Sequence, residues 1–307
     1  MPFSIDIANV SKSFGKVKAL NDVSVSVGKG ELFGFIGPDG AGKTTLFRIV
    51  TTLLLPDKGK ITVNGFDVEK DFKSIRKITG YMPGRFSLYM DLTVQENLNF
   101  YAGIFNTSVK ENYGLIKDIY SQIEPFKNRR AGDLSGGMKQ KLALSCALIH
   151  KPDILVLDEP TTGVDAVSRM EFWGILKKMK NYGITILVST PYMSEASLCD
   201  KIALMQNGNL LSVATPDKVI NNYPYKLFKI RTSSMQNLPG DIKSFGNIKS
   251  VYRFGDYIHF AVDGKSGFNE RDLNRYLTET GYRNVELEKI NPDIEDCFLE
   301  LMDKEGL

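Results

Sequence analysis

Hydrophobic and polar residues alternate along two early segments of the chain. Residues 3–27 alternate on both sides of Gly15-Lys16, and residues 61–68 alternate around Asn64-Gly65. A period of two is typical of strands that bury one face, and Asn-Gly is the strongest short signal for a tight hairpin turn. These segments therefore predict antiparallel strands joined in hairpins.

Three later segments are almost continuously apolar: residues 31–37, 154–158 and 184–189. Short apolar runs of this kind are typical of strands that are buried on both faces of a parallel sheet. Together with the hairpins, they predict a mixed α/β core.

A helical insertion is predicted for residues 87–151, between two of these apolar runs. Thr93 and Glu96 form a capping-box pattern before an apolar stretch, and a second helical pattern ends before Pro152, which stops a helix. His150 lies near that end, where a surface cation suits the helix dipole, so we expect it to be structural or solvated rather than part of a site.

The last third of the chain predicts a separate small domain. A polar, Pro-containing stretch at residues 221–224 closes the first domain, which we expect to span residues 1–222. Residues 225–307 then predict strand, helix, hairpin, helix, strand and helix, with the hairpin turning at Gly255-Asp256. The fold class is therefore α/β with a small α+β C-terminal domain.

Composition excludes several classes of protein. The 307 residues are 42% hydrophobic and 24% charged, as in an ordinary folded protein. A net charge of +3 is too small and too scattered for a nucleic-acid surface, so no nucleic acid is expected as a partner. No run approaches the roughly 18 apolar residues of a membrane helix, so we expect any membrane role to come through a partner protein. Cys146, Cys199 and Cys297 have no paired spacing and are expected to be isolated buried thiols.

The sequence GPDGAGKTT at residues 37–45 matches the pattern G-x-x-x-x-G-K-[ST]. It follows an apolar strand and opens a helix, the context in which such a loop wraps the phosphates of ATP with backbone N–H groups. A glycine-rich turn with an incidental lysine is the alternative, which this context disfavours. Lys43 would neutralise phosphate charge, and Thr44 would offer its hydroxyl to Mg²⁺. The predicted ATP-binding residues of this loop are Gly37, Asp39, Gly40, Ala41, Gly42, Lys43, Thr44 and Thr45.

Two further motifs follow. The strand at residues 154–158 ends in Asp158 and Glu159, where Asp158 can hold Mg²⁺ and Glu159 can orient or deprotonate the attacking water. Between the loop and this strand lies LSGGMKQKL, in which Ser135, Gly136 and Gly137 precede a helix and offer a second anion-binding N-terminus. An ordinary helix cap at Ser135 is the alternative.

The order of these motifs resembles the nucleotide-binding subunits of ATP-binding cassette (ABC) transporters, over about residues 3–220. The resemblance implies a P-loop NTPase core of ABC type, with an antiparallel β subdomain and a helical insertion. It also implies a head-to-tail dimer in which each ATP lies between one cassette's phosphate loop and the other's LSGG. In that arrangement Phe14 stacks on adenine, Asp165 lies in the loop that crosses the dimer interface, and an integral-membrane permease at the cytoplasmic face is the partner.

The motifs GPDGAGKTT, LTVQENLNFYA and LSGGMKQKLAL are most similar to those of ABC-2 type drug and polysaccharide exporters and of the first cassette in tandem-cassette efflux ATPases. Residues 225–307 resemble, in length and element order, the C-terminal domain of daunorubicin-type export ATPases. We expect a dimer-stabilising or regulatory role for this accessory domain.

Two positions depart from the family pattern. Gly84 stands where a glutamine is expected to contact Mg²⁺ and water, and Pro191 stands where a histidine is expected to donate to the γ-phosphate. Arg85, Thr190 and Tyr192 are the nearby candidates to replace them. The chain is therefore predicted to be an ABC ATPase whose hydrolysis rate is in doubt. A hydrolysis-impaired regulatory cassette of a heterodimer and a non-transport ABC ATPase remain the alternatives, so the second cassette is expected to be either an identical or a different chain.

Overall fold

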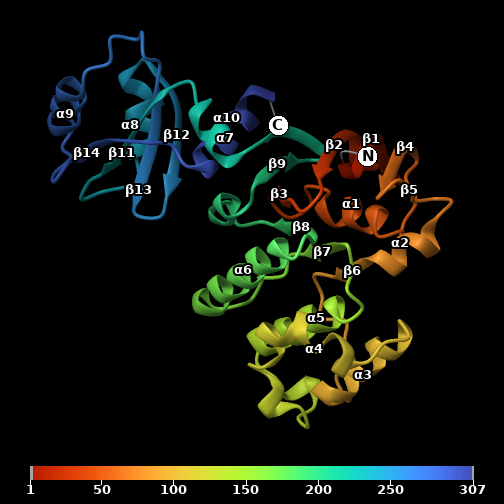
Figure 1. Cartoon of the computed structure of the whole chain (residues 1–307). Coiled ribbons are helices and arrows are strands. Elements are labelled where there is room, and N and C mark those ends of the chain that lie inside the picture. Colours follow the sequence, from red (N-terminus) through yellow and green to blue (C-terminus); the bar gives the residue numbers. More distant parts are fainter. Residues whose placement is uncertain (1–2, 306–307) are drawn as a thin grey trace. The chain divides into compact units, whose positions relative to one another are not determined.

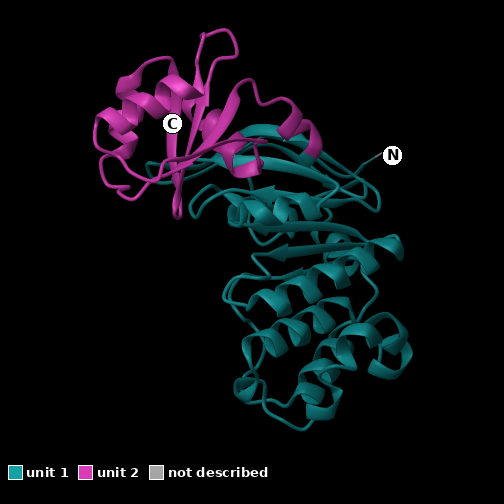
Figure 2. Cartoon of the chain, turned by 90° about the vertical axis from the view of Figure 1, so that its left-hand side faces the viewer, with its two compact units in different colours: residues 1–216, 307 teal, residues 217–306 magenta. Residues whose placement is uncertain are grey.

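The computed structural model describes residues 3–305, which form two compact units (Figures 1 and 2). The first unit extends to Pro216, and the second begins at Asp217. Within residues 3–305 no helix is both long and apolar enough to cross a membrane. Cys146, Cys199 and Cys297 are buried and unpaired.

The first unit contains a four-stranded antiparallel sheet in the order β2-β1-β4-β5. Its strands are β1 (Phe3–Phe14), β2 (Val17–Gly28), β4 (Lys58–Val63) and β5 (Phe66–Asp67). Phe14 pairs with Val17 across the first turn, and Val63 pairs with Phe66 across the second. Asn64 and Gly65 have φ angles of 46° and 83°, as a two-residue hairpin turn requires. Both predicted hairpins are confirmed.

The second sheet of this unit has six strands in the order β10-β9-β3-β8-β7-β6 and is parallel except at β10. Its strands are β3 (Leu32–Ile36), β6 (Thr79–Met82), β7 (Ile154–Asp158), β8 (Thr185–Thr190), β9 (Lys201–Gln206) and β10 (Asn209–Ala214). Every residue of β3, β7 and β8 is buried, which confirms the three predicted parallel strands. Because these strands are parallel, their carboxyl ends meet at one edge of the sheet.

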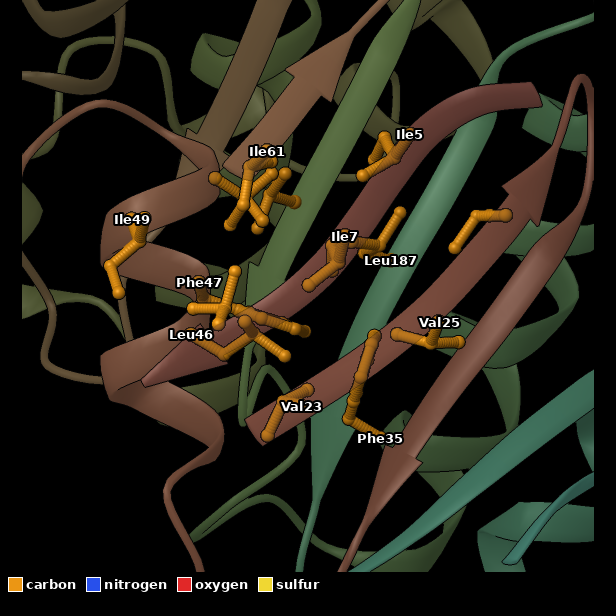
Figure 3. Packing of buried hydrophobic residues seen from close by; sticks show 14 of the residues in the cluster. Ile5, Ile7, Val23, Val25, Phe35, Leu46, Phe47, Ile49, Ile61 and Leu187 are labelled. Atoms are coloured by element: carbon orange, nitrogen blue, oxygen red, sulfur yellow. The ribbon is translucent and has the colours of Figure 1, made fainter. Parts of the chain in front are cut away.

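Helix α1 (Lys43–Val50) packs between the two sheets of the first unit (Figure 3). Phe47 is fully buried, and its ring makes an edge contact with Phe35 at a centroid distance of 5.5 Å. Truncating such a side chain costs about 3–5 kcal/mol, so this packing anchors the helix that follows the glycine-rich loop. The residues labelled in this core are Ile5, Ile7, Val23, Val25, Phe35, Leu46, Phe47, Ile49, Ile61 and Leu187.

The remaining helices of the first unit are α2 (Phe72–Ile78), α3 (Val94–Ile104), α4 (Val109–Tyr120), α5 (Gly136–Leu148) and α6 (Ala166–Asn181), with 3-10 turns η1 (Glu124–Phe126), η2 (Ala131–Asp133) and η3 (Met193–Leu198). Helices α3 to α5 form the predicted helical insertion. The backbone N–H of Glu96 donates to the Thr93 hydroxyl at 3.2 Å, and the Thr93 N–H donates to the Glu96 carboxylate at 2.8 Å. The predicted capping box is confirmed.

Of the two expectations for His150, structural or solvated, the structure supports the structural one. Its ring stacks on Phe105, with 3.7 Å between the ring centroids, and it lines a pocket rather than the open surface. Burial lowers the pKa of His150 to about 4, so the ring is neutral at pH 7. The helix-end pattern could not show that Phe105, far away in sequence, lies over this position.

The second unit is built on a four-stranded antiparallel sheet in the order β12-β13-β11-β14. Its elements are α7 (Pro216–Asn221), β11 (Lys226–Arg231), α8 (Leu238–Phe245), β12 (Ile248–Phe254), β13 (Tyr257–Val262), α9 (Glu270–Glu279), β14 (Glu286–Ile290) and α10 (Ile294–Glu305). Phe228 and Phe260 of the sheet pack with Leu238 of α8 and Leu273 of α9 in a separate hydrophobic core. The predicted element order from residue 225 onward matches the structure.

Candidate nucleotide-binding site

The loop at residues 37–45 connects β3 to α1 and packs tightly against two other strands. Gly40 and Gly42 have φ angles of 79° and 103°, a backbone conformation that residues with a side chain rarely adopt. A Cβ atom at Gly42 would lie 2.4 Å from the Ala19 carbonyl oxygen of β2, and one at Gly37 would lie 2.2 Å from the Met205 carbonyl oxygen of β9. Glycine at positions 37 and 42 therefore allows the loop to lie close to the backbones of β9 and β2.

The N-terminus of α1 is suited to an anion. Its N-cap is Gly42, which has no side chain to accept hydrogen bonds from the N–H groups of the first helical turn. Such N–H groups, together with the helix dipole, favour a phosphate at this position.

Lys43 is turned inward at the start of α1 and is only 3% exposed. Its Nζ atom donates to the carbonyl oxygens of Gly37 at 2.7 Å and Pro38 at 2.9 Å. The same atom lies 3.3 Å from Oε1 of Glu159, with which it forms an ion pair. The loop lysine and the acidic end of β7 thus meet, although they are distant in sequence.

Thr44 and Asp158 form the second contact between these segments. The Thr44 hydroxyl donates to Oδ1 of Asp158 at 3.1 Å, and the Asp158 residue is 2% exposed. Burial, followed by the negative charge of Asp158, raises the pKa of nearby Tyr81 to about 12, so that Tyr81 stays neutral. A hydroxyl and a carboxylate are hard oxygen donors, which fit Mg²⁺ as it is held by one or two carboxylates plus phosphate oxygens.

Ser189, at the end of β8, was not predicted as a site residue. Its hydroxyl donates to Oδ1 of Asp158 at 2.6 Å and accepts from the N–H of Glu159 at 2.9 Å. Glu159 has a φ angle of 49°, an unusual value for glutamate, which this hydrogen bond helps to hold. The signal in the sequence was the strand end at ITILVST, because the ends of adjacent parallel strands lie together.

The LSGG segment lies elsewhere in the first unit. Ser135 caps α5, with its hydroxyl accepting from the N–H of Met138 at 3.4 Å. A Cβ atom at Gly136 would meet only Gly163, and one at Gly137 would meet only Ser168, so neither reaches the phosphate loop within 4 Å. The structure therefore does not join this chain's LSGG to its own loop.

Asp165 lies next to LSGG at the N-terminus of α6. Its carboxylate accepts from the N–H of Ser168 at 3.0 Å, and this hydrogen bond lowers the pKa of Asp165. Because Ser168 also faces Gly137, LSGG and the Asp165 turn form one surface region.

Phe14 is the exposed last residue of β1 and pairs with Val17 at the hairpin turn. The other strand of that hairpin carries Ala19, which touches the phosphate loop at Gly42. Phe14 thus belongs to the hairpin whose second strand approaches the phosphate loop.

Gly84 and Pro191, the two positions predicted to depart from the family pattern, lie just after β6 and β8. A Cβ atom at Gly84 would be 3.1 Å from the Asp158 carbonyl oxygen, so the position adjoins the acidic strand end. Pro191 directly follows β8, where Thr190 donates to Glu195 at 2.5 Å and the Tyr192 ring stacks on Arg169 at 4.2 Å. Two of the three candidate replacements are therefore already engaged within the chain.

A mostly apolar pocket of about 530 Å³ lies between the core and the helical insertion. The segment that carries Gly84 forms one wall, through Pro83 and Phe86, and α3 forms another through Tyr101 and Ile104. The segment that carries Gly84 thus both lines this pocket and adjoins the backbone of Asp158.

Strand, phosphate loop, helix and a neighbouring acidic strand end define the class as a P-loop nucleotide-binding protein with the insertions of an ATP-binding cassette. Residues 20–162 match the family model described as ABC transporter. The chain is 33% identical over 308 residues to the Nod factor export ATP-binding protein I of Rhizobium meliloti (strain 1021), a match that covers 98% of this chain and 89% of that protein. The chain therefore belongs to the family of ABC transporter ATP-binding proteins.

Two further similarities extend this result. The chain is 39% identical over 216 residues to the probable multidrug ABC transporter ATP-binding protein YbhF of Escherichia coli (strain K12), covering 69% of this chain but only 37% of that longer protein. A dimeric ATP-binding cassette solved in a post-hydrolysis state with ADP and Pi has a TM-score of 0.63 and 25% identity, covering 69% of this chain and 98% of that one. The fold is that of an ABC ATPase.

Proposed function

We propose that this chain is the ATP-binding subunit of an ABC-2 type exporter, which drives a separate membrane permease from its cytoplasmic face. The observation that carries the proposal is the meeting of Lys43 and Thr44 with Asp158 and Glu159 at one sheet edge. The names of the relatives, which include Nod factor export and multidrug transport proteins, support export as the direction.

The geometry supports the following order of events. Lys43 is held by two carbonyl oxygens and Glu159, and an entering triphosphate offers it stronger charged acceptors. As Lys43 turns to the phosphates, Glu159 loses its ion-pair partner and becomes available to orient and deprotonate water. Mg²⁺, when bound, would neutralise charge on the phosphate oxygens, with Thr44 and Asp158 as the residues that hold it.

We propose that two cassettes pair head to tail. LSGG lies beside the Asp165 turn and away from its own phosphate loop, so it is available to the loop of another chain. The helix N-terminus at Ser135 would then face the γ-phosphate from the opposite side. The dimeric form of the structural relative supports this arrangement.

The pocket beside Gly84 supports coupling to a permease. Ile104 and Leu53 are large, exposed hydrophobic residues that line it. Exposed apolar groups around a groove are typical of protein-binding sites. An apolar segment of the permease that fills this pocket would press on residues 83–88, which connect to the Asp158 region.

Co-purification of the full chain from detergent extracts tests this proposal. A multi-span membrane protein should accompany the wild-type chain and be lost from Ile104→Asp, which places a charge in the pocket. Tyr182→Asp is the matched control, because Tyr182 is 62% exposed and lies at the far end of α6. Ribosomes or DNA in place of a membrane protein would instead support a non-transport ATPase.

Gly84 and Pro191 favour a second candidate function, a cassette that binds ATP but hydrolyses it slowly and serves a regulatory role. Losing one preorganised donor costs on the order of 100- to 1,000-fold in rate. Pro191→His combined with Gly84→Gln should then accelerate single-turnover hydrolysis at least about tenfold without tightening ATP binding. Wild-type rates that are typical of complete cassettes, and that Glu159→Gln abolishes, would refute the slow site.

We further propose that residues 1–222 act as the ABC ATPase domain and residues 225–307 as an accessory, dimer-stabilising or regulatory domain. The second unit has a hydrophobic core of its own, and the match to the Nod factor relative extends over it. Deleting residues 225–307 should weaken self-association and spare ATP affinity. Loss of ATP binding would contradict this assignment.

A further inference from the structure

The buried carboxylate of Glu195 has no role in the site described above. It lies in η3, just after β8, and is only 3% exposed. Burying a carboxylate without partners is costly, and a neutral side chain would avoid that cost. A buried carboxylate at this position is therefore expected to have partners that stabilise its charge.

Both oxygen atoms of Glu195 accept hydrogen bonds from hydroxyls of two different segments, the turn after β7 and the end of β8. Oε1 accepts from Thr161 at 2.8 Å, and Oε2 accepts from Thr190 at 2.5 Å. Thr161 lies two residues after Glu159, and Thr190 is the last residue of β8. Glu195 thus joins the segment after β7 to the end of β8.

The chain around Glu159 is linked to β8 by hydrogen bonds on both sides of this residue. On one side its N–H donates to the Ser189 hydroxyl, and on the other the chain is held through Thr161 and Glu195. A residue with a φ angle of 49° keeps that conformation only when its surroundings determine it from more than one direction. The hydrogen bonds of Glu195 to Thr161 and Thr190 therefore restrain the backbone of Glu159 from the side opposite Ser189.

Helix α6 provides a third group. Nε of Arg169 lies 3.7 Å from Oε1 of Glu195, and this buried Nε has no hydrogen-bond partner among the residues that the structure describes. Arg169 lies one turn after Asp165, which caps the same helix. Arg169 therefore places a positive charge from the first turn of α6 beside the Glu195 carboxylate.

We propose that Glu195 is a positioning residue for ATP hydrolysis, which holds the Glu159 carboxylate in its working position by fixing Thr161 to the end of β8. This inference rests on the proposed hydrolysis at Glu159. Glu195 touches neither ATP nor water in this role and acts through Thr161. Loss of the link should therefore slow the chemical step and leave ATP binding intact.

Single-turnover hydrolysis and ATP affinity, measured on the full-length chain, test the proposal. Thr161→Val keeps the shape of the side chain but removes the hydroxyl, and we expect a fall of about 10- to 100-fold in rate, as for other small misplacements of reacting groups. Thr161→Ser restores the hydroxyl and should recover the rate. Glu195→Gln should also slow hydrolysis. Because both substitutions break the same link, the double variant Glu195→Gln/Thr161→Val should have a hydrolysis rate no lower than that of the slower single variant. Glu171→Gln, an exposed acid on α6 paired with Lys141, is the charge-matched control and should keep the wild-type rate.

The possible results separate the two claims. A rate in Thr161→Val equal to that of wild type, or an equal fall in Thr161→Ser, overturns the positioning role. A parallel loss of ATP affinity in Thr161→Val also overturns it, because the loop rather than Glu159 would then be disturbed. Wild-type chain that binds ATP and never hydrolyses it overturns the proposed hydrolysis and this inference together.

Discussion

Two glycines of the phosphate loop offer a matched pair of substitutions. Gly40 and Gly42 have positive φ angles, so alanine at either position carries a similar backbone strain of about 1–2 kcal/mol. Their surroundings differ. A Cβ atom at Gly40 meets no described atom within 4 Å, whereas one at Gly42 would lie 2.4 Å from the Ala19 carbonyl oxygen. The difference between the two variants therefore isolates the contact between the loop and β2.

The size of the effect follows from this contact. Because Cβ contacts with backbone essentially never fall below 3.0 Å, Gly42→Ala must move the loop by about 0.6 Å. A phosphate hydrogen bond of about 2.9 Å would lengthen to about 3.5 Å, at the limit of a real bond. One such bond to a charged group contributes about 1.5–3 kcal/mol. ATP affinity should thus fall roughly 10- to 150-fold in Gly42→Ala.

Titration with a fluorescent ATP analogue and urea unfolding measure the two effects separately. Gly40→Ala should lower the free energy of unfolding by about 1–2 kcal/mol and leave the Kd for ATP within about threefold of wild type. Gly42→Ala should show the large loss of affinity. Equal losses of affinity in the two variants would refute the reasoning, since backbone strain alone would then explain them.

Two further predictions concern Ser189, which bonds to Asp158, and the half-buried His150 of the apolar pocket. Ser189→Ala removes the donor to Asp158 and should lower the free energy of unfolding by about 1.5–3 kcal/mol in urea titrations, whereas Ser197→Ala, on the surface, should leave it unchanged within about 0.5 kcal/mol. For His150, burial lowers the pKa from 6.5 to about 4, so the unfolded chain binds a proton in this range that the folded chain does not. Wild type should therefore lose stability between pH 7 and pH 5, and His150→Phe should lose less; identical pH profiles of the two proteins would contradict this explanation.

Local patterns were sufficient to predict most of the fold. The hairpins at Gly15-Lys16 and Asn64-Gly65 depend on residues adjacent in sequence, and the parallel strands depend on uninterrupted apolar runs. The motif spacing also identified Lys43 and Asp158, which the structure brings to the same edge. Their roles in binding ATP and Mg²⁺ remain predictions.

The contacts that could not be predicted join segments far apart in the chain. Ser189 bonds to Asp158 across adjacent strands, and Glu195 bonds to Thr161 from beyond β8. Both residues flank Pro191, a position that the family pattern marks, but that pattern does not give the bonding partner of either residue. The packing of His150 could not be predicted for the same reason, because it depends on Phe105, which belongs to a different part of the helical insertion.

Mixing two defective variants tests most directly whether one chain's phosphate loop and another's LSGG form a single ATP site. Lys43→Ala disables the loop, and Gly137→Asp disables LSGG. Neither should hydrolyse ATP alone, but a mixture should recover about a quarter of the wild-type rate, since about half of randomly paired dimers are mixed and each has one complete site. Mixing Lys43→Ala with Thr44→Ala, two loop variants, should recover nothing. No recovery in the first mixture, or full activity of Gly137→Asp alone, would contradict the head-to-tail cassette.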